Sequence, residues 1–94
     1  MSYILVRHRV GRFSDFEAVF RGGAERRRRM GSRGGKVFRN VNDTGDVLIL
    51  LEWDTAEAAK GWSDSFESRE AAEWATSGAG FTATVMEEVL ETDS

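Results

Sequence analysis

The pattern of apolar positions is clearest in residues 47–53, which read Val-Leu-Ile-Leu-Leu-Glu-Trp and follow a cluster of turn-forming residues at 42–46. A short apolar run bounded by turn residues predicts a buried strand. Successive side chains of a strand point to opposite faces, and here the odd-numbered set is apolar and the even-numbered set includes Leu48 and Leu50. Both faces of this strand are therefore expected to be covered.

Three further segments, 3–10, 36–41 and 81–91, show the alternation of a strand. In the first of them Ile4, Val6, His8 and Val10 share one face. The turn at 42–46 is short enough to join the second segment to the central strand, which predicts an antiparallel hairpin.

Helical spacing of apolar residues predicts helices at about 15–30, 55–63 and 66–77. Ser14-Asp15-Phe16-Glu17 and Asp54-Thr55-Ala56-Glu57 match the capping box, so we expect each to start a helix. Gly31 is expected just after the first helix, with a loop at 32–35. The pair Gly22-Gly23 lies inside that helix, where it indicates either close approach of a backbone or ligand or a tolerated weak spot.

The resulting order, β-α-β-β-α-α-β, is that of a ferredoxin-like α+β fold with a four-stranded antiparallel sheet. Right-handed connections place both helical segments on one face of the sheet. The chain of 94 residues is expected to form one domain, 1–94, and has no segment left to cover the second face. We therefore expect a homodimer in which two copies pack sheet to sheet.

Composition adds constraints on location and partners. The sequence has no cysteine, no apolar run of membrane-spanning length and no signal-peptide pattern at its start, so we expect a cytoplasmic protein that does not bind membranes. The net charge is −3, but residues 1–39 carry +8 and residues 40–94 carry −11. This asymmetry indicates either an anionic partner or two halves that neutralise each other in the fold.

Several segments carry a resemblance to a known family. They are Val6-Arg7-His8-Arg9-Val10 followed by Phe13-Ser14-Asp15-Phe16, then Gly34-Gly35-Lys36-Val37-Phe38-Arg39-Asn40, Leu51-Glu52-Trp53-Asp54 and Ser68-Arg69-Glu70-Ala71-Ala72. Over nearly its whole length the chain resembles the dimeric α+β barrel superfamily, in the branch of antibiotic-biosynthesis-monooxygenase-like and small cyclase-like proteins. The resemblance implies a homodimer whose two sheets close into a barrel, with a pocket in each subunit between sheet and helices.

The activities implied by this resemblance are cofactor-free oxidation of polycyclic phenols to quinones, and haem degradation. The haem-degrading branch uses an Asn on the first strand, matched here by His8, and a Trp that is matched by Trp62. Its helical His falls near Ala72-Glu73, where this chain has no imidazole, which speaks against haem degradation. We expect no cofactor.

His8 is the candidate catalytic residue. It is the only histidine in the chain and lies on an otherwise apolar strand face. Imidazole titrates near neutral pH, so it can accept a proton from a phenol or hydroquinone. The alternative is a core histidine that is hydrogen-bonded to a backbone carbonyl.

Aromatic residues are numerous for a domain of this size and are candidates for lining a pocket for a small aromatic molecule. The candidate substrate-binding residues are Phe20, Phe38, Trp53, Trp62, Phe66 and Glu73. Trp62 and Phe66 are favoured because they flank the expected break between two helices. The alternatives are plain core packing for the aromatic residues and an exposed helix position for Glu73.

Other chemistries have little support in the sequence. One histidine and no cysteine cannot build a zinc site, and no nucleophilic triad or P-loop is present. The cluster Arg26-Arg27-Arg28-Arg29 is expected to be a solvated helix end rather than a nucleic-acid site, because no aromatic residues interleave with it; a modest anion site there is the remaining alternative. The sequence thus leads to two hypotheses, a cofactor-independent monooxygenase or a non-catalytic ligand-binding or structural dimer.

Overall fold

The computed structural model describes residues 1–66 and 70–94, without the side chains of Phe66 and Ala79. The elements are β1 (Ser2–Val10), α1 (Phe13–Gly22), α2 (Ala24–Arg29), β2 (Ser32–Asn40), β3 (Asp43–Trp53), α3 (Ala56–Phe66), α4 (Glu70–Trp74), the 3-10 helix η1 (Ala75–Ser77) and β4 (Gly78–Glu87).

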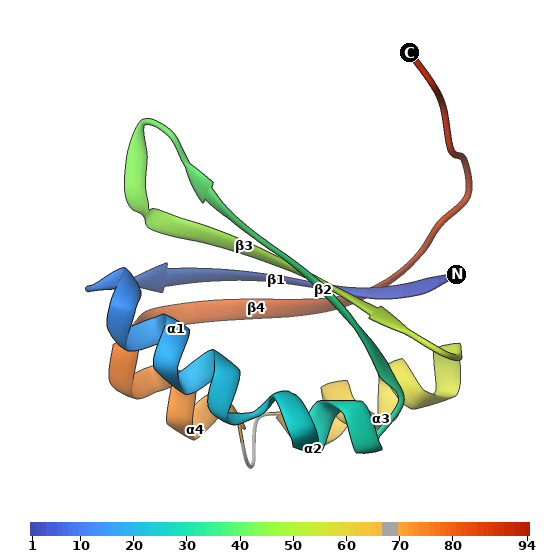
Figure 1. The fold of residues 1–94 in the computed structure, drawn as a ribbon, viewed down its shortest axis with the longest axis horizontal. Helices are drawn as coiled ribbons and strands as arrows, with labels where there is room; N and C mark the ends of the chain where they lie inside the picture. The colour runs from blue at the N-terminus through green and yellow to red at the C-terminus, as the bar shows by residue number, and fades with distance from the viewer. Residues whose placement is uncertain (67–69) are drawn as a thin grey trace.

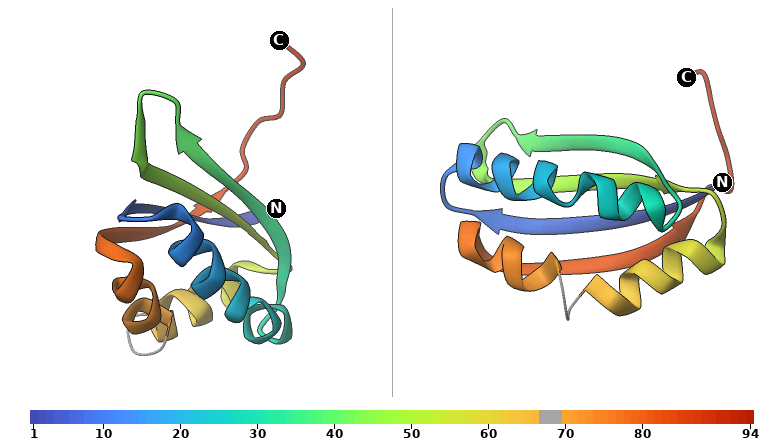
Figure 2. Two further views of the ribbon diagram at one scale, coloured as in Figure 1. Left: turned by 60° about the vertical axis from the view of Figure 1, so that its left-hand side comes forward. Right: turned by 60° about the horizontal axis from the view of Figure 1, so that its bottom comes forward.

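The four strands form one antiparallel sheet in the order β2-β3-β1-β4. The helices lie along one face of this sheet, while the tip of the β2–β3 hairpin and the C-terminal tail project on the other side (Figures 1 and 2). The predicted ferredoxin-like α+β fold is confirmed, and β3 is a central strand, paired with β2 on one edge and β1 on the other. The helices cover one of its two apolar faces, and the cover of the second face stays a prediction.

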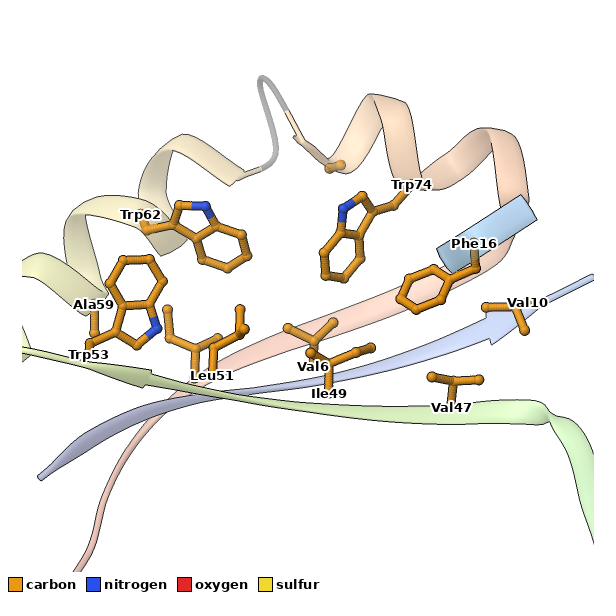
Figure 3. Packing of buried hydrophobic residues seen from close by; sticks show 12 residues of the cluster. Val6, Val10, Phe16, Val47, Ile49, Leu51, Trp53, Ala59, Trp62 and Trp74 are labelled. Carbon is orange, nitrogen blue, oxygen red and sulfur yellow. The ribbon is translucent and has the colours of Figure 1, made fainter. Parts of the chain in front are cut away.

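The core lies between the sheet and the helices. Trp62, Trp74 and Phe16 reach from the helices toward the apolar side chains of the strands (Figure 3). Val6 and Ile49, which are paired across β1 and β3, are fully buried beneath them. The predicted alternation along β1 and β3 is thus confirmed on this face.

The first helix differs from its prediction at both ends. It begins at Phe13, Arg12 takes the N-cap position in an extended conformation, and no side chain caps it, so the capping box at Ser14 does not form. The helix also breaks at Gly23 into α1 and α2. A Cβ on Gly23 would lie 2.8 Å from Nη1 of Arg27 and 2.8 Å from Oε2 of Glu70, so the close approach here is by two side chains.

The later helices also have different limits. The Thr55 hydroxyl accepts a hydrogen bond from the Ala58 amide at 3.0 Å, so Thr55 caps α3, one position later than the predicted box. Helix α3 continues to Phe66, beyond the predicted end at 63. The predicted start of the following helix includes residues 67–69, which lie outside the described residues; α4 is described over Glu70–Trp74, and η1 follows it to Ser77.

Several strand limits were also wrong, because the neighbouring strand decides how far a ladder extends. β3 begins at Asp43 rather than 47, and β4 begins at Gly78 rather than 81. β2 begins at Ser32, where a loop was predicted, since β3 is long enough to pair Ser32 with Trp53. β4 ends at Glu87 rather than 91, since β1 begins at Ser2, which is the partner of Glu87. The residues beyond, including Val89, lie in the exposed tail.

A buried ion pair joins the helices. Nη1 of Arg27 in α2 donates to Oε2 of Glu70 in α4 at 2.8 Å, and Nη2 donates to the carbonyl of Phe20 in α1 at 2.8 Å. The other Glu70 oxygen accepts a hydrogen bond from Nε1 of Trp62 in α3 at 2.9 Å. Arg27 and Glu70 are 3% and 1% exposed, and burial lowers the pKa of Arg27 while Glu70 opposes that shift. Four helices therefore meet at one carboxylate and one guanidinium.

Neutralising this carboxylate should destabilise the fold. Glu70→Gln leaves the Arg27 charge buried without a counter-charge, and we expect the free energy of unfolding to fall by about 3–5 kcal/mol. Urea unfolding followed by tryptophan fluorescence, at one fixed protein concentration, measures this loss. Glu73→Gln is the matched control, because Glu73 makes an exposed ion pair with Arg26, which is worth about 0–1 kcal/mol. Equal losses in the two variants would contradict the structural role of the Arg27–Glu70 pair.

Candidate functional site

His8 lies near the C-terminal end of β1 on the helix-covered face, where it is 1% exposed. Three aromatic rings surround the imidazole: Phe16 from α1 at 5.6 Å, Phe81 from β4 at 5.4 Å and Trp74 from α4 at 6.1 Å between ring centroids. The imidazole and the three rings come from four elements, β1, α1, β4 and α4. The alternation of β1 places His8 on this face, and the helical spacing of α1 places Phe16 toward it.

The hydrogen bond of His8 fixes its tautomer. Nδ1 lies 2.9 Å from the carbonyl oxygen of Gly80, and a carbonyl only accepts, so Nδ1 carries the proton. In the neutral ring Nε2 then has a free lone pair, and this atom is buried without a hydrogen-bond partner among the described residues. The structure thus contains the carbonyl bond expected for a core histidine and, on the same ring, an unused proton acceptor.

A cleft lies between helices α1 and α2 and strand β2, which is an edge of the sheet. It consists of two cavities of about 440 and 290 Å³, which share Phe20 and Gly35. We refer to it as the α1–α2/β2 cleft. Gly35 is required at its floor, because a Cβ there would lie 2.0 Å from the carbonyl oxygen of Leu50.

The two parts of the cleft differ chemically. The smaller part is lined by Phe13, Phe16 and Val37, with the ion pair between Glu17 and Arg21 beside them. The larger part is lined by arginine side chains and by the start of β2. These lining residues are Arg27, Arg28, Ser32, Arg33 and Gly34. The α1–α2/β2 cleft therefore has an apolar end and a basic end, with Phe20 between them.

Phe16 connects this cleft to His8. Its ring packs against the imidazole at 5.6 Å and against Phe20 at 5.6 Å, and it also lines the apolar end. His8 itself is not among the lining residues of either part of the cleft. One aromatic ring thus lies beside both the base and the space in which a ligand would sit.

The structure brings few of the predicted binding residues to this cleft. Phe20 lines it, whereas Trp53 and Trp62 are buried in the core with their rings 5.5 Å apart. Phe38 is paired with Leu48 and lies on the opposite face of the sheet, 48% exposed. The substrate-binding role of these residues stays a prediction.

The remaining two predicted residues lie away from this cleft or outside the description. Glu73 is exposed and lies 3.3 Å from Nη1 of Arg26, so its position fits the helix-surface alternative. The side chain of Phe66 lies outside the described residues.

Sequence reasoning missed the buried members of the site. Arg27 was placed in a solvated helix end, which is wrong for this one arginine although Arg28 and Arg29 are exposed. A signal was present, because Arg27 falls on the same helical face as Phe16 and Phe20. Glu70 carried no signal in the sequence, since its importance depends on a contact with a segment 43 positions away.

Two further features are absent from the part of the chain that the structure describes. No three histidine, aspartate or glutamate side chains there are grouped so that they could hold a metal ion. Among the same residues, no helix is long and apolar enough to cross a membrane.

Solved structures with the same fold come from several bacteria. The fold matches SnoaB, described as a cofactor-independent oxygenase from Streptomyces nogalater, with a TM-score of 0.79, 15% sequence identity and coverage of 99% of this chain and 97% of that chain. It also matches an antibiotic biosynthesis monooxygenase with a TM-score of 0.68 and 15% identity, covering 96% and 100% of the two chains. For Rv0793 from Mycobacterium tuberculosis the TM-score is 0.67 at 11% identity, covering 99% and 100%.

At these identities the structural matches establish the fold alone. No curated protein matches the sequence. The profile of a family, however, matches residues 2–85, which span β1 through most of β4. The chain therefore belongs to the antibiotic biosynthesis monooxygenase family.

Proposed function

We propose that this protein is a cofactor-independent monooxygenase that oxidises a phenolic, polycyclic compound bound in the α1–α2/β2 cleft, and that it works as a homodimer. Family membership supports monooxygenase chemistry in general. The observation that carries the finer proposal is the buried Nε2 of His8, which has no partner among the described residues and lies within a shell of aromatic rings.

This reaction requires few groups from the protein. Oxidation of a phenol to a quinone by one O₂ places one oxygen atom in the product and releases the other as water, so the substrate supplies all the electrons. The step that a side chain can assist is removal of the phenolic proton, because the phenolate gives up an electron to O₂ far more readily than the phenol does. In this proposal Nε2 of His8 accepts that proton while the Gly80 carbonyl holds Nδ1–H in place.

Phe16 must move for the substrate to reach this base. Its ring packs on the imidazole and lines the apolar end of the cleft, so a flat substrate that displaces it would contact the imidazole ring. The surrounding Phe81 and Trp74 would then keep water away from the reacting atoms.

A second candidate function is ligand binding without catalysis. The observation that favours it is the burial of His8, which is not among the residues lining the cleft. In that case the imidazole is a core group and the cleft is only a binding site.

Replacing His8 separates these two functions. His8→Asn keeps a donor for the Gly80 carbonyl but removes the base, so we expect kcat for O₂ uptake with a phenol substrate such as 1-naphthol to fall about 100- to 10,000-fold while ligand affinity changes little. An oxygen electrode measures turnover and calorimetry measures binding. Saturable binding in the wild type with no turnover of any phenol would establish the non-catalytic alternative and overturn the proposal.

The homodimer in this proposal uses the face of the sheet opposite the helices. On this face Leu48 and Leu50 are only half-buried, Phe38 is 48% exposed and Met86 is 46% exposed. These apolar residues come from three strands, and the ion pair between Arg7 and Asp46 adjoins them. A sheet face with exposed apolar residues flanked by charges is typical of a protein interface, and a second copy offers a matching one.

A charge on this face should separate the dimer. Wild-type protein at micromolar concentration is expected to sediment with twice the 10.5 kDa mass of the chain. Phe38→Glu introduces a carboxylate into the contact of each subunit, at a cost of about 1–3 kcal/mol each, and should shift the protein to the monomer mass. Ala18→Glu is the control, since Ala18 is exposed on α1, on the side of the sheet away from the proposed contact. A monomeric wild type would overturn the dimer.

A further inference from the structure

The basic end of the α1–α2/β2 cleft has an unbalanced charge. Three arginines line it, and no carboxylate is among its lining residues. Arg27 is already neutralised by Glu70 at 2.8 Å. Arg33 has a looser, exposed partner in Asp54 at 3.5 Å, and Arg28 has no ion pair among the described residues. Two guanidinium groups therefore remain available to an anion.

The fold brings Arg28 and Arg33 to one place. Arg28 is in the last turn of α2 and Arg33 is at the start of β2, and the chain reverses between them at Gly31. Gly31 has φ of +112°, a conformation that a glycine adopts readily and that other residues rarely adopt. The tight reversal places both side chains on the wall of the same cavity.

The apolar neighbour limits what kind of anion fits. Phe20 separates the basic end from the apolar end, and the guanidinium of Arg27 already stacks on its ring at 4.2 Å from the centroid. Beyond Phe20 the lining is Phe13, Phe16 and Val37. A small inorganic anion would leave this surface uncovered, whereas a ligand with both an acidic group and fused rings would cover both ends.

From this arrangement we infer that the α1–α2/β2 cleft binds an aromatic carboxylic acid. Its carboxylate lies between Arg28 and Arg33, and its ring system lies against Phe13 and Phe16. This inference names the substrate class of the oxygenase proposed above and so rests on that proposal. Arg28 and Arg33 are specificity-determining residues here, far from the proton transfer at His8.

The cost of desolvation strengthens this selectivity. A neutral ligand that fills the cleft would remove water from the two guanidinium groups without giving them an acceptor, which is unfavourable. A carboxylate offers two acceptor oxygens and matches the planar donors of arginine. The discrimination between an acid and its neutral isostere is expected to be about 10- to 100-fold.

Calorimetric titration with 2-naphthoate and 2-naphthamide tests this inference without any turnover. The two probes share shape and ring system and differ in charge. We expect the wild type to bind 2-naphthoate at least about 10-fold more tightly, with an affinity that falls as salt is raised. Equal affinities for the two probes would overturn the inference.

Neighbouring arginines supply matched variants. Arg28→Gln and Arg33→Gln should each weaken 2-naphthoate binding about 10-fold and leave 2-naphthamide unchanged, and Arg28→Lys should recover part of the loss. Arg29→Gln removes the same charge from the next position, which is not among the lining residues, and should have no effect. Equal losses in Arg28→Gln and Arg29→Gln would show a general effect of charge and overturn the site.

The source of the anion and the activity are tested separately. Tighter binding of 2-naphthyl phosphate than of 2-naphthoate would overturn the carboxylate assignment. O₂ uptake with 1-naphthol and with 1-hydroxy-2-naphthoate then distinguishes the two proposals. Turnover of both with equal kcat/KM overturns the preference for an acid and leaves the oxygenase intact, whereas charge-selective binding without turnover overturns the oxygenase and leaves the site.

Discussion

The ion pair between Arg27 and Glu70 is the constraint on which the helical layer depends. Both groups are buried away from water, so each needs the other. Nη2 of Arg27 also donates to the Phe20 carbonyl, and Oε1 of Glu70 accepts from the Trp62 indole. Apolar residues of similar volume could give a buried site equal or greater stability. The pair therefore acts mainly by fixing how the helices are arranged. Its hydrogen bonds can all form only when the four helices pack in this one way.

Several local features follow from this pair. Gly23 must lack a side chain because the two charged groups occupy the space beside it, and the first helix is broken at that position. Arg27 is held against Phe20 at the wall of the α1–α2/β2 cleft, with its charge balanced from behind. The basic character of the cleft thus comes from its other arginines, while Arg27 provides a rigid wall.

The strands could be predicted from sequence because alternation is a local property. The burial of Val6 and His8 on one face of β1 follows from a period of two, and the structure has both on that face. Helix ends depend on competition between capping and packing. The box at Ser14 fails because the helix already starts at Phe13, whose ring packs against Phe16 at 6.0 Å.

The site was predictable only in part. His8 stood out as the single imidazole on an apolar face, but an aromatic composition does not tell which rings line a cleft. For Phe38 the alternation could have predicted the correct face of the sheet. Phe38 is paired with Leu48, so its side chain lies on the face away from the helices. Glu70 could not be recognised, since nothing in its own segment indicates that α2 packs beside it.

The free edge of β2 has a further consequence. Its ladder with β3 shifts register near Ser32 and again near Asn40, and its side chains include Arg33, Lys36 and Arg39. Irregular, positively charged edges are poor templates for an added strand, and repulsion between like charges would oppose the stacking of one copy beside another. The features that shape the cleft thus also guard the protein against open-ended aggregation into fibrils.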